Sequence, residues 1–429
     1  MKLNTRRTVL VGMAFLSICT FWQMYEAIIP LILKHTFHVN DTFSGVIMAL
    51  DNVLALFMLP LFGSLSDRTN SRFGRRTPYI LIGTVASCLF MLLIPVADQM
   101  GVFWMFLTAL MLVLVSMSIY RSPAVALMPD LTPKPLRSKG NAIINLMGAV
   151  GGMITLVLIQ LLVPKDTTRP NYLPLFASVA GIMLLALVLL VCTIPEKRLA
   201  AETAAMQEPE EPEDTPVLEK DKPEKLEPGV KKSLVFLLFS VAFWFMGYNA
   251  ITSAFSKFAQ IQWGMTGGSF ASSLLIATGA AILSYIPVGV VSSRIGRKKT
   301  ILIGVAVLAL CFFSGSLFQT YHPLVNIVFA LVGISWAAIN VNSYPMVVEM
   351  SQGSSVGKFT GYYYTFSMAA QIITPVISGA LLQHVGYWTL FPYAAAFSAL
   401  AFVTMLFVKH GDSKPLPAKT RLEAFDVPD

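Results

Sequence analysis

The chain has 429 residues, of which 55% are hydrophobic and only 13% charged, and its mean hydropathy is +0.68. This composition excludes a soluble globular protein, which cannot bury that much apolar surface and also cover itself with charge. It is typical of a helical protein whose solvent is lipid. The net charge of +8 does not indicate a nucleic-acid partner, because the Lys and Arg residues lie in short segments between apolar runs.

Twelve apolar segments are long enough to span a bilayer, at about 20 residues per helix. The first six spans are expected near 8–33, 41–65, 77–98, 102–128, 138–163 and 171–195. The second six are expected near 233–259, 268–292, 299–319, 322–348, 359–384 and 387–409. The apolar stretch after Arg7 is too long for a signal segment, so we expect it to remain as a helix. The predicted fold class is all-α, polytopic and membrane-embedded.

The segment 196–232 separates the two sets of spans and differs from them in composition. It is rich in Glu, Lys and Pro and poor in large apolar residues, which predicts a solvated and mostly disordered linker. A short helix around 196–206 is the alternative. We therefore expect a six-helix bundle over 1–195, a charged linker over 196–232, a second bundle over 233–409 and a tail over 410–429.

The charge of the loops predicts the orientation in the membrane. Basic residues concentrate after the second, fourth and eighth spans and near both termini, whereas the loops of the other side carry few. Because basic loops stay on the cytoplasmic side, we expect both termini to lie in the cytoplasm. We expect the protein to reside in the cell membrane.

The two halves of the sequence repeat. The stretch FWQMYEAI (21–28) resembles FWFMGYNAI (243–251), and GSLSDRTNSRFGRR (63–76) resembles GVVSSRIGRKK (289–299). The segments that begin at Asp130 and Glu349 share acid, Ser or Thr, and Lys positions. Repeats in the same order predict two pseudo-symmetric bundles with a substrate site between them and alternating access by rocking.

The stretch GSLSDRTNSRFGRRTPYI (63–80) resembles the loop between helices two and three of the glycoside–cation symporter branch of the major facilitator superfamily. YRSPAVALMPDL (120–131) is similar to the sucrose-transporter side of that branch. The resemblance implies a sugar or glycoside, with a disaccharide as our interpretation, carried together with H⁺ or Na⁺. Asp51 matches the second-span acid of the branch. Arg121, with no acid in the middle of its span, departs from the melibiose-permease pattern and favours H⁺.

Two carboxylates and one guanidinium are the candidates for coupling. Glu26 and Asp51 lie well within spans, where an ionisable group usually faces a cavity and a partner, and Arg121 is comparably deep. Burial favours the protonated carboxyl and a nearby Arg favours the carboxylate, so a site that alternates between these surroundings exchanges a proton. A permanent structural ion pair, or an Arg121 that reaches the membrane surface, is the alternative.

Aromatic and polar residues recur on one helix face and predict a sugar site. Aromatic rings take the apolar face of a sugar, and carboxylates and amides take its hydroxyls. The candidates are Trp22, Tyr25, Glu26, Asn52, Arg121, Trp244, Tyr248, Asn249, Trp336 and Asn340. Packing or an interfacial position is the alternative for the tryptophans.

The basic turn after the second span predicts a gate on the cytoplasmic side. Small residues allow close helix approach, and an acid can bind a helix N-terminus or an arginine. The candidates are Gly63, Asp67, Arg68, Gly74, Arg75, Arg76, Asp130, Arg297 and Glu349.

A lysolipid or drug carrier of the same fold is the alternative function. The sequence contains no paired-ligand spacing, phosphate loop or nucleophile motif, so we expect no enzyme, metal or cofactor. We expect a monomer in the bilayer that binds a small-molecule substrate.

Overall fold

The computed structural model is built from helices and describes residues 3–133, 136–165, 170–206, 227–351 and 356–412. Twelve of its helices have the length and hydropathy of a membrane span, as predicted. The first half contains α1 (Thr5–His35), α2 (Asp41–Arg68), α3 (Thr77–Met100), α4 (Phe103–Asp130), α5 (Arg137–Leu162) and α6 (Leu173–Thr193). After α7 (Glu196–Met206), the second half contains α8 (Pro228–Ile261), α9 (Ala271–Ile295), α10 (Arg297–Gly315), α11 (Val325–Glu349), α12 (Val356–His384), η2 (Tyr387–Thr389) and α13 (Leu390–Leu406).

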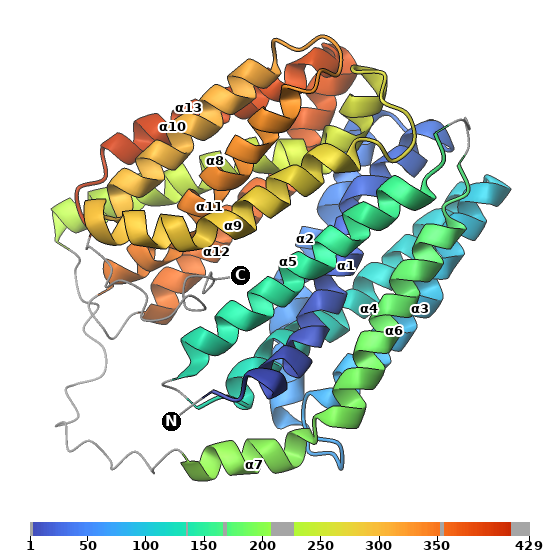
Figure 1. Ribbon diagram of the computed structural model, residues 1–429, viewed down its shortest axis with the longest axis vertical. Coiled ribbons are helices and arrows are strands. Elements are labelled where there is room, and N and C mark those ends of the chain that lie inside the picture. The colour runs from blue at the N-terminus through green and yellow to red at the C-terminus, as the bar shows by residue number, and fades with distance from the viewer. Residues whose placement is uncertain (1–2, 134–135, 166–169, 207–226, 352–355, 413–429) are drawn as a thin grey trace.

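The two halves pack their helices in the same way, which confirms the predicted repeat. In the first half α1 packs on α5 and α6, and α4 packs on α2 and α3. In the second half α8 packs on α12 and α13, and α11 packs on α9 and α10, in the corresponding order. The halves meet chiefly where α2 contacts α12, and also where α5 contacts α9 and α1 contacts α8. Figure 1 shows them as two inclined bodies that converge at one end and diverge at the other.

Local sequence accounts for several helix ends. Asn40 precedes α2, and its side chain accepts a hydrogen bond from the Phe43 amide at 2.7 Å, as an N-cap does. Pro78 lies in the first turn of α3, where a proline ring fits without loss of a helical hydrogen bond. Gly101 ends α3 with a φ of 68°, the left-handed conformation of many C-caps.

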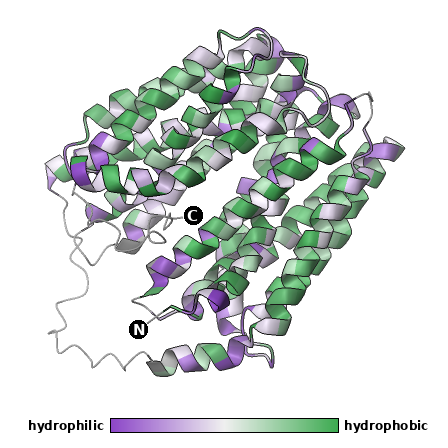
Figure 2. Ribbon diagram, in the orientation of Figure 1, coloured by the Kyte–Doolittle hydropathy of each residue, from purple (hydrophilic) through white to green (hydrophobic). Residues whose placement is uncertain are grey.

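Large apolar side chains cover the outer surface. Leu185 is 60% exposed, Leu283 78% and Leu310 66%. Figure 2 shows that hydrophobic residues extend along the helices of both halves and that hydrophilic ones gather near helix ends and in α7. A bilayer satisfies this surface because its acyl chains are as apolar as these side chains.

The boundaries of the expected linker differ from the prediction. Residues 196–206 form α7, the helix that the sequence left as an alternative, and α8 begins at Pro228 rather than near 233. An Ala-rich segment with Glu and Lys has a high helix propensity, and Leu199 and Ala200 pack against the hydrophobic core. Residues 207–226 of the expected linker and 413–429 of the expected tail lie outside the described residues.

Candidate functional site: a central cavity closed at one end

A cavity of about 810 Å³ lies between the halves. Helices α1, α2, α4 and α5 line it from the first half, and α8, α9, α11 and α12 line it from the second. Its wall extends from Glu26 and Asp51 to Pro129, the residue before the end of α4. The cavity therefore reaches the end of the molecule where α2 and α4 end, which we call the basic end.

Six of the predicted substrate residues and the predicted coupling residue Asp51 line this cavity. They are Trp22, Glu26, Asp51, Asn52, Arg121, Trp336 and Asn340. They come from α1, α2, α4 and α11, so the fold assembles residues that are up to 318 positions apart in the sequence. The wall combines two carboxylates, one guanidinium, two amides and two indole rings, which can hydrogen-bond and stack on one small polar solute.

Asp51, Glu26 and Arg121 form a charged group without close ion pairs. Asp51 Oδ1 accepts hydrogen bonds from the backbone and side-chain nitrogens of Asn52 at 2.6 and 2.8 Å. The Arg121 guanidinium lies 5.7 Å from the centre of the Trp22 ring, at cation–π distance. Among the described residues, none of the three has an oppositely charged atom within 4.0 Å. This conformation therefore leaves their charged atoms directed at the cavity rather than at each other.

An aromatic plate forms the opposite wall. The rings of Tyr248 and Trp336 stack with centroids 3.7 Å apart and an interplanar angle of 7°. Phe245 meets the Trp336 ring edge-on at 5.4 Å. Trp336 lines the cavity, whereas the predicted substrate residue Tyr248 is not part of the wall but stacks on the Trp336 ring, so Tyr248 is a positioning residue for the plate.

Three predicted residues do not take the place that the sequence indicated. Tyr25 and Trp244 are 1% and 0% exposed and pack in the hydrophobic core instead of lining the cavity. The side chain of Asn249 donates a hydrogen bond to the Phe245 carbonyl of its own helix at 2.8 Å. These three residues, like Tyr248, therefore do not line the cavity in this structure, and their place in the substrate site stays a prediction.

The register of the repeat explains the error at Trp244. Phe21 and Trp244 are 223 residues apart, and both are buried. Trp22 and Phe245 are also 223 residues apart, and both line the cavity. Pairing the tryptophans shifts this register by one residue, and one residue turns a helix face by about 100°. Trp244 consequently shares the face of Gly247, whose missing side chain allows close packing on α13.

Sequence reasoning missed Tyr285, Phe245 and Phe15, which also line the cavity. The repeat contained the signal for Tyr285. Gly63 and Gly289 are 226 residues apart, and the same offset takes Leu59 to Tyr285, another lining pair. On α12, Tyr364, Ser367 and Gln371 line the wall at helical spacing.

The other end of the cavity is closed by a buried network between the halves. Asp41, the first residue of α2, accepts from Lys257 of α8 at 3.0 Å and from Lys34 of α1 at 2.9 Å. The Tyr387 hydroxyl donates to both Asp41 oxygens at 2.8 Å. The side chains of Asp41 and Lys257 are 3% and 4% exposed. We call Asp41, Lys257, Tyr387 and Lys34 the clasp.

Close backbone contacts accompany the clasp. A side chain at Gly45 would lie 2.0 Å from the Pro375 carbonyl, and one at Gly268 would lie 2.1 Å from the Ile159 carbonyl. Thr42 also donates to the Gln383 amide oxygen, with its hydroxyl at 2.7 Å. The two halves therefore approach each other closely at the clasp end, at positions where only glycine fits.

The predicted gate residues at the basic end join parts of the same half. Asp130 pairs with Arg75 at 2.7 Å and with Arg76 at 2.8 Å, and Arg76 also pairs with Asp67. In the second half Arg297 pairs with Glu349. Arg68 is exposed and takes part in none of these pairs. Each of these ion pairs therefore joins residues of one half at the open end.

Glu196 is a central residue of this network that the sequence analysis missed. Its buried carboxylate accepts hydrogen bonds from the backbone amides of Arg75, Arg76 and Thr77 at 2.8 to 2.9 Å. It thereby satisfies the free N–H groups at the start of α3. Gly74 has a φ of 119°, and a side chain there would lie 2.3 Å from the Glu196 carboxylate. Because Gly74 has no side chain, the Glu196 carboxylate can lie against it.

Gly63, another predicted gate residue, has a different role, since it allows α2 to approach Ser122 of α4.

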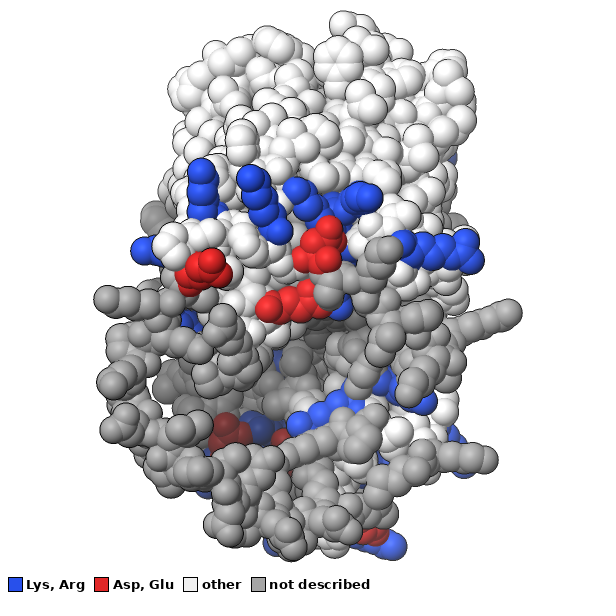
Figure 3. Space-filling view, turned by 90° about the vertical axis from the view of Figure 1, so that its left-hand side faces the viewer, with Lys and Arg blue, Asp and Glu red and all other residues white. Residues whose placement is uncertain are grey.

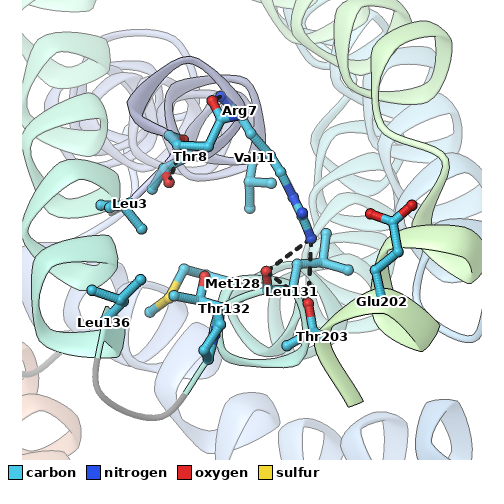
Figure 4. A pocket seen from close by; sticks show the side chains of 12 residues that line it. Leu3, Arg7, Thr8, Val11, Met128, Leu131, Thr132, Leu136, Glu202 and Thr203 are labelled. Atoms are coloured by element: carbon cyan, nitrogen blue, oxygen red, sulfur yellow. Dashed lines mark hydrogen bonds between the residues drawn. The ribbon is translucent and has the colours of Figure 1, made fainter. Parts of the chain in front are cut away.

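The far end of α7 is held as well. Arg7 donates to the Leu131 carbonyl at 2.9 Å and reaches the Thr203 hydroxyl at 3.5 Å (Figure 4). These groups border a second cavity of about 480 Å³ between α1, α7 and the region where α4 ends. Glu196 and Thr203 thus fix α7 across the basic end of the first half.

The basic end is open between the halves. Figure 3 looks at this end and shows a hollow between the two halves, with Lys and Arg side chains on both sides of it. In the described part of the chain no three His, Cys, Asp or Glu side chains gather as a metal site. The molecule therefore has the geometry of a carrier whose central site is reached from the basic end and sealed at the clasp end.

Comparison with known proteins identifies carriers of this architecture. A transporter of the POT family in complex with 5-aminolevulinic acid superimposes with a TM-score of 0.70 at 13% identity, over 94% of this chain and 95% of that one. The nucleoside transporter NupG superimposes with a TM-score of 0.67 at 14% identity, over 94% of this chain and all of that one.

In sequence, 177 residues are 26% identical to the proline/betaine transporter of Escherichia coli (strain K12), which is 40% of this chain but only 34% of that protein. A family match extends over residues 11–286 and 238–427, which together cover nearly the whole sequence. The chain belongs to the Major Facilitator Superfamily.

Proposed function

We propose that the protein is a secondary active transporter that carries a sugar or glycoside across the cell membrane by alternating access, coupled to H⁺ symport. The observation that supports this most is the central cavity, where Glu26, Asp51 and Arg121 face an aromatic plate. Sugars bind to such walls because rings stack on their C–H faces while charged groups and amides bind their hydroxyls.

The carboxylates are the proposed proton site. Glu26 and Asp51 lie close enough to interact electrostatically, and Asp51 also interacts with Arg121. A proton on one carboxyl relieves the repulsion between the two, and approach of the guanidinium favours its release. Asp51 is on α2 and Arg121 on α4, so a change in the packing of these helices during rocking alters that balance.

The basic end is proposed to face the cytoplasm. It carries the α2–α3 turn (69–76), α7 and the start of α10 (297–299), which together hold eight Lys and Arg residues. The conformation is then open inward, with the clasp as the outer seal. Opening to the outside requires the clasp to separate and the two halves to approach each other at the basic end.

A zwitterionic solute is the second candidate, and Arg121 is the observation that favours it. A guanidinium and two carboxylates without ion pairs among the described residues match a ligand that carries both charges. The partial similarity to a proline/betaine transporter agrees with this chemistry. A lysolipid or drug carrier, the third possibility, would need a cavity that opens toward lipid.

Uptake into proteoliposomes with an imposed inward H⁺ gradient separates these candidates. Radiolabelled sucrose and maltose are compared with proline and glycine betaine, and an ionophore that dissipates the gradient is the control. Sugar uptake that requires the gradient supports the proposal. Gradient-driven uptake of proline or betaine alone assigns the cavity to zwitterions, and transport of neither class contradicts both.

A further inference from the structure

A pocket of about 470 Å³ lies on the first half at the basic end, apart from the central cavity. Arg72, Lys197 and Arg198 contribute cationic groups, and Phe73, Val191 and Ile194 contribute apolar walls. It is formed where α3 begins and α6 ends. We propose that this pocket binds the headgroup of an anionic phospholipid.

The pocket has an excess of positive charge. In the described ranges neither Arg72 nor Lys197 has a carboxylate within ion-pair distance. Arg198 pairs only with Glu202 of its own helix at 2.8 Å, and its side chain is 78% exposed. The Arg72 guanidinium lies 4.6 Å from the Phe73 ring, which holds it over an apolar surface. A phosphate can therefore bind here without displacing a buried ion pair.

The pocket is also held in shape. Lys197 and Arg198 directly follow Glu196, whose carboxylate binds the start of α3 next to Arg72. The opposite end of α7 is tied to Arg7 through Thr203. The cations therefore extend from a fixed backbone, and less conformational entropy is lost when they bind an anion.

The surface next to the pocket fits acyl chains. Helices α3 and α6 pack against each other and form the outer side of the first half, away from the second half (Figure 1). Leu185 and Val188 of α6 are 60% and 54% exposed, and Ile82 and Leu89 of α3 are 59% and 63% exposed. Because this apolar strip leads to the cations, the site favours a lipid over a free phosphate. Basic pockets at the cytoplasmic side of membrane helices bind lipid headgroups in this way.

The test is native mass spectrometry of the full chain, which is released from detergent in the spectrometer. Phosphatidylglycerol or phosphatidylcholine with identical acyl chains is added to the protein beforehand, and the bound lipid is measured. Variant R72Q/K197Q removes two cations of the pocket. Variant K231Q/K232Q, at the start of α8, removes two exposed cations at the same end of the other half and is the matched control. Variant R72K/K197R keeps the charge and shows whether the pocket tolerates substitution.

We expect phosphatidylglycerol to bind the intact protein, the control and R72K/K197R with similar affinity. Loss of two charges should weaken binding roughly 25-fold, at about fivefold per cation. Equal binding of phosphatidylglycerol to R72Q/K197Q and the intact protein would overturn the proposal. So would equal retention of phosphatidylcholine, or binding of glycerol phosphate as tight as that of the lipid.

Discussion

Charged side chains inside this membrane protein fall into two groups that differ in their partners. Asp41 and Lys257 are paired, buried and hydrogen-bonded at the clasp end. Glu26, Asp51 and Arg121 face the cavity and have no ion pair among the described residues. Paired charges stabilise a conformation, whereas charges directed at a cavity are available to a substrate or a proton.

Trp336 should contribute to substrate affinity through its exposed ring face. Trp336→Ala removes the face that stacks on the substrate and leaves Tyr248 without its partner. We expect about tenfold weaker binding, which corresponds to ~1.4 kcal/mol, measured by substrate-induced quenching of intrinsic fluorescence. Trp104→Ala, at a residue 74% exposed to the outside, is the control. An unchanged Kd in Trp336→Ala would exclude the plate from the site.

At single positions the sequence predicted chemistry better than orientation. Glu26, Asp51 and Arg121 were identified because an ionisable residue in a span is rare and seldom faces lipid. Trp244 was placed on the cavity wall although it is buried, because one residue of register decides which face of a helix meets the cavity. Testing the 223-residue offset of the repeat on several residue pairs would have matched Trp244 with Phe21 and placed it on the buried face.

Among the elements, α7 differs from the spans in what holds it in place. Leu199 and Ala200 pack it against the hydrophobic core, and hydrogen bonds of Glu196 and Thr203 attach it to the first half. Glu196 connects it to the α2–α3 turn, where Arg75, Arg76 and Asp130 meet. The helix therefore stiffens the basic turn that must move past the second half when the halves close.

Replacement of Glu196 should destabilise this turn. Glu196→Ala removes a charged acceptor from three buried amides, which should cost about 2 kcal/mol or more. We expect a lower midpoint of thermal unfolding, followed by intrinsic fluorescence. Gly74→Ala should lower it too, because its side chain collides with Glu196. Glu202→Ala removes the exposed pair with Arg198 and an electrostatic interaction with Arg7, but no hydrogen bond to a backbone amide, and should lower the midpoint much less. An unchanged unfolding midpoint in Glu196→Ala would contradict the role of Glu196 in stabilising the turn.

The spans were predictable because hydrophobic length is a strong signal in membrane proteins. The place of α7 was not, since its attachments join residues about 120 and 196 positions apart. Short alanine-rich segments form helices or coils according to such contacts. Composition alone therefore predicted a linker where the structure has a docked helix.

For the whole molecule, the clasp is the buried polar network that joins the two halves at the closed end. Its central pair joins α2 to α8 across 216 residues, so no local pattern in the sequence indicated it. The sequence predicted two rocking halves, but the open and closed ends depend on contacts between them. The structure shows the clasp end closed and the basic end open.

Loss of one clasp partner should shift the protein toward the opposite conformation. Asp41→Asn leaves Lys257 buried without its counter-ion, which typically costs about 3–5 kcal/mol. Spin labels at Phe43 and Trp388, both exposed near the clasp on different halves, report the separation by double electron–electron resonance in a background without the four native cysteines.

We expect the distance distribution to move to longer values in Asp41→Asn. It should return toward the original in the double variant Asp41→Asn/Lys257→Met, where no buried charge remains. Arg198→Ala, at an exposed ion pair, is the control. A distribution that stays the same in all variants would show that the clasp does not determine the conformation.

The most direct test of the central claim is H⁺-driven sugar uptake into proteoliposomes by the intact protein, Asp51→Asn and Glu26→Gln, measured with counterflow exchange in the same vesicles. The account predicts that the intact protein accumulates sugar only with an inward H⁺ gradient. At least one of the two variants should lose accumulation while it retains exchange, because it still binds sugar but no longer carries the proton. Undiminished gradient-driven accumulation in both variants would contradict the assignment of the cavity carboxylates as the proton site.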